Sequence, residues 1–294
     1  MLSPSPPKPS HGNSAQSPDL TGIPNNSAAQ SNTSEALGAR LMASRALSLQ
    51  LAAPLTDEDQ TVQAMDDASP TKWHLAHTTW FYEAFILRDY LDNYQSYDPQ
   101  FDYCFNSYYE LKGARHPRPE RGLLTRPSAN EVRAYRRHVD AGLQRLVADL
   151  DDMAHANNVA KLLELGINHE QQHQELLLTD ILALFARNPL RPAYQPSTAN
   201  QIALADTPTS EITWHDFSGG ITHIGYADDG FHYDNEGPCH EALIQPFQLA
   251  HRLVTNGEWL EFIKDGAYQT PTLWLADGWA EVQKEGWNAP QYWE

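Results

Sequence analysis

The sequence predicts a four-helix bundle followed by a smaller region of short strands and irregular structure. Three observations support this fold class. Apolar residues recur at helical spacing in four segments of the first 190 residues. The last 84 residues hold nine of the 16 glycines and six of the eight tryptophans. A polar segment of about 20 residues, PAYQPSTANQIALADTPTS, separates the two parts, so we expect two domains joined by a linker.

Composition separates the start of the chain from the first helix. Residues 1–33 are dominated by Ser, Pro, Asn, Gln and Ala, which cannot bury enough apolar surface to offset their ordering entropy. We therefore expect a disordered tail there. Apolar residues at helical spacing begin at Ser34, and the first helix is expected to stop at Pro54.

The second helix is expected to open at Ser69 and Pro70, with the serine as N-cap and the proline in the first helical position. The pattern KWHLAHTTWFYEAFIL continues this helix to about Tyr90. Residues 92–127 then form a long stretch, rich in Tyr, Pro, Arg and Gly, that is expected to be irregular. A connection of this length inside a compact domain is usually functional.

Two further helices complete the bundle. Ser128 and Glu131 have the spacing of a capping box, and the helix that they start is expected to reach about Asp152. The fourth helix is expected to follow Asn157 or Asn158 and to end near Asn188.

The remaining sequence predicts a second domain that is α+β or mostly irregular. GGITHIGY and ALIQPFQLA have the texture of short strands between turns. The chain stops at APQYWE without a closing element, so we expect this domain to be partial. The expected limits are 1–33 for the tail, 34–190 for the bundle, 191–210 for the linker and 211–294 for the second domain.

Charge and composition exclude several classes of protein. The formal net charge of −18 over 294 residues argues against a general binder of nucleic acids or membrane surfaces, which need a basic field. No run approaches the roughly 20 apolar residues that cross a bilayer. The N-terminal prolines do not fit a secretory signal, and two distant cysteines provide no disulfide framework, so we expect a cytoplasmic protein.

The fourth helix carries the strongest chemical signal, NHEQQHQELLLTD. His169 and His173 are four residues apart, so both imidazoles can reach one metal ion. A third ligand is expected from the second helix, where His77 shares the apolar face and His74 lies one turn earlier. Three histidines with open coordination positions are typical of a catalytic metal site, because structural sites use four protein ligands.

The same segment satisfies the HExxH pattern of zinc proteases, with Glu170 as the general base. That interpretation needs a third ligand further along the chain. The sequence after His173 lacks the metzincin glycine and histidine, and no glutamate occurs between Glu175 and Glu211. The protease interpretation is therefore disfavoured.

The long connection supplies a second signal. Residues 112–137 contain eight Lys or Arg and two Glu, a local charge of +6. Arg118 and Arg121 are spaced to bind one or two carboxylates, which arginine recognises in a bidentate manner. A solvated basic loop explains the composition equally well.

Three motifs in order, LAHTTWFYE, NSYYELKGARHPRPERGLLTRPS and NHEQQHQELLLTDI, resemble the N-terminal DinB-like domain of the ergothioneine-biosynthesis sulfoxide synthases, the EgtB family. The segment from FSGGITHIGY to NGEWLEFI resembles the start of the formylglycine-generating-enzyme-like (sulfatase-modifying-factor) domain, of C-type-lectin-like fold, that follows in that family. The two resemblances together cover about residues 36–294.

The resemblance implies specific roles for several residues. It assigns His77, His169 and His173 to Fe(II), which removes His74 from the ligand set, and Arg118 and Arg121 to the carboxylates of a thiol substrate. It also implies a catalytic tyrosine in the later part of the second domain, at a position beyond residue 294. The chain is therefore expected to be a C-terminally truncated form that binds iron without turnover.

The implied reaction joins a thiol, γ-glutamylcysteine or cysteine, to the imidazole C2 of hercynine with O₂ as co-substrate, and gives a sulfoxide. Three alternatives stay open. The related ovothiol-type enzymes attach cysteine to another imidazole carbon of histidine. DinB-type thiol transferases use zinc or nickel without oxygen chemistry. A binding scaffold without catalysis would also be compatible with a lectin-like second domain.

Overall fold

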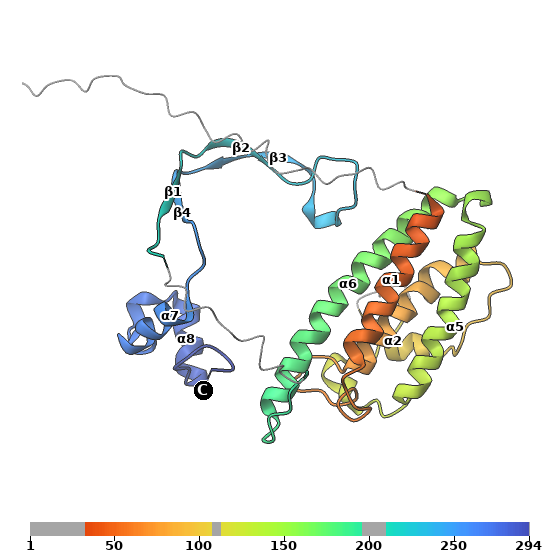
Figure 1. Cartoon of the computed structure of the whole chain (residues 1–294), viewed down its shortest axis with the longest axis horizontal. Helices are drawn as coiled ribbons and strands as arrows, with labels where there is room; N and C mark the ends of the chain where they lie inside the picture. Colours follow the sequence, from red (N-terminus) through yellow and green to blue (C-terminus); the bar gives the residue numbers. More distant parts are fainter. Residues whose placement is uncertain (1–32, 108–112, 196–209, 294) are drawn as a thin grey trace, which may run out of the picture.

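The computed structural model describes residues 33–107, 113–195 and 210–293 (Figure 1). The predicted helical bundle is confirmed: its four long helices lie side by side in Figure 1. They are α1 (Ser34–Ala52), α2 (Thr71–Tyr82), α5 (Ala129–Ala148) and α6 (Ala156–Arg187). Apart from Thr33, whose side chain caps α1, the expected tail lies outside the described residues.

The start of α2 differs from the prediction by one residue. Pro70, not Ser69, is the N-cap, and Thr71 is the first helical residue. Ser69 is engaged elsewhere, because its backbone N–H donates to Asp180 and its hydroxyl accepts a hydrogen bond from Arg121. Tertiary contacts thus replace the local cap that the sequence predicted.

The helix that follows His77 contains a π-helical turn. α2 continues into η2 (Glu83–Leu87) and then α3 (Arg88–Tyr90), which confirms the predicted end at Tyr90. The carboxylate of Glu83 is fully buried in this turn and accepts hydrogen bonds from the hydroxyls of Tyr94 and Tyr135. These bonds tie the π-helical turn to α5 and to the connection that follows.

The connection between α3 and α5 is more ordered than predicted. It contains a short helix, α4 (Phe101–Phe105), and a 3₁₀ helix, η4 (Arg118–Leu123), and residues 108–112 lie outside the described part. The capping box of Ser128 and Glu131 is confirmed at the start of α5. A 3₁₀ turn, η5 (Leu150–Asp152), leads to α6, which begins two residues before the earlier of its two predicted starts.

The core of the bundle fills the space between all four long helices. It includes Leu41 of α1, Trp80 of α2, Leu143 of α5 and Leu163 of α6, all essentially inaccessible to solvent. Gly166 of α6 faces the ring of Tyr82 so closely that a Cβ atom at this position would overlap it. The absent side chain lets α6 approach the end of α2.

The C-terminal region contains two antiparallel strand pairs and short helices. β1 (Trp214–Phe217) pairs with β4 (Phe247–Ala250), and β2 (Gly220–Ile224) pairs with β3 (His240–Ile244). The predicted segment GGITHIGY holds β2, and ALIQPFQLA holds the end of β3 and all of β4, whereas β1 was not predicted. The helical elements are η6 (Asp234–Glu236), α7 (Asn256–Lys264), η7 (Ala267–Gln269), η8 (Pro271–Leu273) and α8 (Ala276–Glu285). The domain limits 34–190, 191–210 and 211–294 stay a prediction.

In the described residues, no helix has both the length and the apolar character that crossing a bilayer requires.

Candidate metal centre

Three histidines from two helices come together inside the bundle. His77 lies on α2, and His169 and His173 lie one turn apart on α6. One ligand atom of each lies within 4.8 Å of those of the other two. The Nε2 atoms of His77 and His169 are 3.2 Å apart. The three side chains thus form a set that could hold a metal ion.

The ring of His77 is held from two sides. Its Nδ1 lies 2.6 Å from the carbonyl oxygen of Phe105, so Nδ1 carries the proton and donates to this oxygen. The indole of Trp73 stacks on the imidazole, with centroids 4.6 Å apart and planes 9° from parallel. His77 therefore presents the unprotonated Nε2 to the other two histidines.

His74 lies beside the three histidines but does not join them. Its Nδ1 is 2.9 Å from Nδ1 of His173, and its Nε2 is 2.9 Å from Oδ2 of Asp180. Both ring nitrogens of His74 are therefore engaged, and its contact with His173 is at the Nδ1 atom of that ring. The alternative that the helical pattern left open, His74 as third ligand, does not fit this arrangement.

Burial keeps the three imidazoles neutral. It lowers the pKa of His169 to about 4 and the pKa values of His77 and His173 well below 6.5. The Nδ1 atom of His169 is also buried and has no hydrogen-bond partner among the described residues. Neutral imidazoles grouped closely enough to reach one ion are ligands that suit a divalent transition metal. The residues present therefore fit a metal ion.

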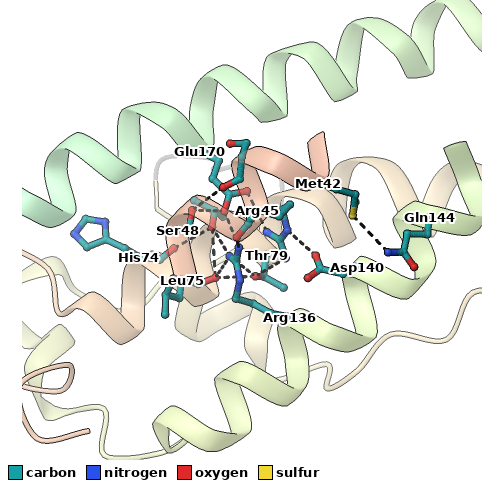
Figure 2. A network of polar contacts seen from close by, with 12 residues as sticks. Met42, Arg45, Ser48, His74, Leu75, Thr79, Arg136, Asp140, Gln144 and Glu170 are labelled. Carbon is teal, nitrogen blue, oxygen red and sulfur yellow. Dashed lines mark hydrogen bonds and ion pairs between the residues drawn. The ribbon is translucent and has the colours of Figure 1, made fainter. Parts of the chain in front are cut away.

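Glu170, the glutamate of the HExxH pattern, lies in a different environment (Figure 2). Its carboxylate accepts hydrogen bonds from Arg45, Arg136 and Ser48, at 3.2, 2.8 and 2.6 Å. Burial alone would raise the pKa of Glu170, but the two guanidinium groups lower it to about 2. The ring of His74 points away from this network in Figure 2. Glu170 is thus an ion-pair partner in the core, which agrees with the rejection of the protease interpretation.

The two arginines of the predicted carboxylate clamp both lie in η4. Arg121 is buried, its guanidinium carbon is 3.4 Å from the ring centroid of Trp73, and it donates to the hydroxyls of Ser69 and Ser107. Arg118 is half-buried and donates to the backbone carbonyl of Asp67. Arg121 adds to the lowering of the pKa values of His74, His77 and His173. η4 therefore places positive charge beside the histidines.

Sequence reasoning missed three residues around the site: Trp73, Asp180 and Phe105. Asp180 had a recognisable signal, because it is a carboxylate inside the apolar run LLLTDILALF and lies seven residues, two helical turns, after His173. The stacking of Trp73 and the role of the Phe105 carbonyl have no such signal, since both depend on tertiary contacts.

Comparisons with known proteins give the following similarities. Residues 40–177 match the DinB superfamily. The chain is 31% identical over 226 residues to a hercynine oxygenase of Mycolicibacterium smegmatis, which covers 76% of this chain and 49% of that protein. It is 29% identical over 261 residues to a hercynine oxygenase of Mycobacterium tuberculosis, covering 88% and 57% respectively. The chain thus spans about half the length of these relatives, and the similarity extends beyond the helical bundle.

Proposed function

We propose that this chain, whose residues 40–177 belong to the DinB superfamily, is an iron-dependent oxidoreductase of the hercynine oxygenase type. The observation that carries the proposal is the cluster of His77, His169 and His173. It lies within the DinB-like part of the chain, and the relatives that match across this part are hercynine oxygenases.

In the proposed reaction, γ-glutamylcysteine or cysteine is joined through sulfur to C2 of the hercynine imidazole. The thiol S–H and the C2–H bonds break, a C–S bond forms, and one atom of O₂ enters the sulfoxide while the other leaves in water. Sulfur and carbon together lose four electrons, and O₂ accepts them. Bound Fe(II) would supply this oxygen chemistry and keep positions open beyond the three imidazoles.

The chain's own residues would bind and orient the reactants. His77, His169 and His173 would hold the iron, because one ring nitrogen of each lies within 4.8 Å of those of the other two. Arg118 and Arg121 would bind the carboxylates of the thiol substrate from η4. Trp73 contacts both Arg121 and His77, so it would help to set the spacing between the substrate carboxylate and the iron. The buried position of His77 and the half-buried positions of His169 and His173 would limit the access of water.

An anaerobic Fe(II) titration tests the metal site, with melting temperature as a second readout. We expect one iron per chain and a higher melting temperature, because an ion that binds the folded state alone stabilises it by mass action. His77→Ala and His169→Ala should each abolish both effects.

The matched control is Gln172→Ala, an exposed position on the same helix between the two α6 histidines, which should bind iron like the wild type. A His77→Ala variant that kept the full shift in melting temperature would show that His77 is not a ligand.

A metal-dependent thiol transferase is the second candidate. The match to the DinB superfamily is confined to residues 40–177, in the helical region, and by itself does not distinguish such a transferase from an oxygenase. Such an enzyme would use zinc or nickel and would consume no oxygen. Oxygen uptake that depends on both hercynine and thiol separates the two candidates.

A further inference from the structure

We propose that Asp180 and His74 are positioning residues that determine which ring nitrogen of His173 faces the metal. The inference rests on the proposed metal site and goes beyond it, because neither residue is one of the three ligands. It follows from a continuous series of contacts, Asp180 to His74 to His173, that connects α6 with α2 and returns to α6.

The first link fixes the tautomer of His74. Asp180 Oδ2 accepts a hydrogen bond from the backbone N–H of Ser69 at 2.8 Å and lies 2.9 Å from Nε2 of His74. A carboxylate can only accept in both contacts, so Nε2 of His74 carries a proton. In a neutral imidazole this leaves Nδ1 of His74 with a lone pair and no hydrogen.

The second link fixes the tautomer of His173 in the same way. The Nδ1 atoms of His74 and His173 are 2.9 Å apart, which is a hydrogen bond that needs one proton between them. Because Nδ1 of His74 has none, Nδ1 of His173 must donate. Nε2 of His173 is then unprotonated and is available to the metal.

The other two histidines of the cluster are held differently. His77 donates its Nδ1 proton to a backbone carbonyl, that of Phe105, which no substitution of a side chain removes. His169 has no partner at Nδ1 among the described residues. The hydrogen-bond contact of the His169 ring that the structure records is with His77, at Nε2. His173 is therefore the candidate ligand whose tautomer depends on side chains outside the three histidines, and a substitution can test that dependence.

Both positioning residues are built into the bundle. His74 is 3% exposed and Asp180 is 14% exposed, so water does not readily replace either contact. Groups that hold the second nitrogen of a metal-bound histidine typically change metal affinity by about 10- to 100-fold when removed. The same size of effect is expected for Asp180 and His74.

The experiment uses the full chain in three forms, His74→Phe, Asp180→Ala and the double variant, with Zn(II) as the diamagnetic probe. In the metal-free wild type, ¹⁵N imidazole spectra should show His173 protonated at Nδ1 alone. Each single variant should show a mixture of tautomers at His173 and about 10- to 100-fold weaker Zn(II) binding. The double variant should bind Zn(II) like His74→Phe, because Asp180 acts through His74.

Two further variants show whether Asp180 and His74 orient His173 or only stabilise the packing of α2 against α6. Asp180→Asn keeps an oxygen that accepts both hydrogen bonds. In this variant His173 should still be protonated at Nδ1, and most of the Zn(II) affinity should be retained. Thr179→Ala, at an exposed position next to Asp180, should leave both unchanged. Variants that lower the melting temperature but leave the His173 tautomer and Zn(II) affinity at wild-type values would overturn the inference.

The proposed function can fail separately. A wild-type chain that binds neither Fe(II) nor Zn(II) would contradict the metal site, whereas the tautomer of His173 in the metal-free chain would still test the inference. A wild type with His173 protonated at Nε2 would overturn the inference even if the metal bound.

Discussion

Glu170 lies next to one candidate metal ligand in the sequence but on a different face of α6. Its side chain joins Arg45 of α1 and Arg136 of α5, and Arg45 also contacts Asp140 at 2.6 Å (Figure 2). All three of Arg45, Arg136 and Glu170 are buried. The network therefore connects three helices and holds α6 in the rotation that turns His169 and His173 inward.

We expect Glu170→Gln to destabilise the bundle by about 3–5 kcal/mol, because it leaves two buried guanidinium groups without their shared carboxylate. Urea unfolding followed by circular dichroism measures this loss. The matched control is Glu175→Gln, at an exposed position on the same helix, where we expect little change. Equal stability of the two variants would show that the buried network does not hold α6.

Arg118 carries the proposed recognition of the thiol substrate. In the iron-loaded chain under nitrogen, Arg118→Ala should weaken γ-glutamylcysteine binding by about tenfold or more, since a charge-assisted hydrogen bond contributes roughly 1.5–3 kcal/mol. Hercynine binding should weaken less, and calorimetric titrations compare the two ligands. Arg126→Ala, at an exposed position in the same connection, is the control. Equal losses for both ligands would point to a role of Arg118 in folding.

At the scale of elements, the close approach of α6 to α2 places the histidines of the two helices together. Gly166 allows this approach, because the ring of Tyr82 occupies the space that a Cβ atom would need. Tyr82 is itself completely buried and has no room to move aside. Gly166 is three residues before His169, so a shift at this contact is transmitted directly to the metal site.

Gly166→Ala should therefore cost about 1–3 kcal/mol of stability through overpacking and should also weaken metal binding. The second effect is the informative one, since alanine favours a helix more than glycine does and would otherwise stabilise α6. Chemical unfolding and Zn(II) titration measure the two effects. Wild-type metal affinity in a destabilised variant would show that helix separation does not control the site.

Helical periodicity predicted the four long helices because this pattern depends on local sequence. The capping box at Ser128 is an example, since its hydrogen bonds run between residues three apart. The N-cap at Ser69 was predicted wrongly because Asp180 and Arg121, both far along the chain, bind its polar groups. The π-helical turn at Glu83 was also missed, as its buried carboxylate is satisfied by two distant tyrosines.

At the scale of the whole molecule, the two parts of the chain differ in how they bury apolar surface. The bundle encloses a core shared by its four long helices. In the described residues of the C-terminal region, the buried apolar side chains are Ala267, Tyr268 and Val282. Large side chains such as Leu243 and Leu253 are mostly exposed. The stability of the chain therefore resides in the bundle.

The stability of the metal-free bundle should depend on pH through its buried histidines. His169 has a pKa of about 4 in the folded chain, whereas an unfolded histidine has a pKa of about 6.5. The unfolded state binds more protons between these values, so the stabilisation is present above pH 6.5 and is lost as the pH falls toward 4. His169 alone contributes on the order of 3 kcal/mol to this loss.

Urea unfolding of the metal-free chain between pH 7.5 and pH 5 measures the effect. A His169→Gln variant should show a flatter dependence, because it removes one of the protonatable groups. Identical slopes for the variant and the wild type would mean that His169 is not held neutral by the fold.

The histidines of the candidate site could be predicted from the sequence, whereas the residues that contact them and their burial could not. The spacing of His169 and His173 placed both on one helix face, and the resemblance selected His77 over His74. The contact between His74 and Asp180 spans 106 positions of the chain, and no local pattern encodes it. The burial that lowers the histidine pKa values likewise arises only when the helices pack.

The parallel arrangement of Trp73 and His77 gives the site an optical signal. The indole stacks on the imidazole of His77, and the guanidinium of Arg121 also lies over its ring. A transition metal held by His77 would quench the fluorescence of this indole, and a carboxylate that drew Arg121 away would shift its emission. The difference between the wild type and Trp73→Phe isolates this signal from the other seven tryptophans. Occupancy by metal and by substrate would thus be followed separately in one cuvette without an added label.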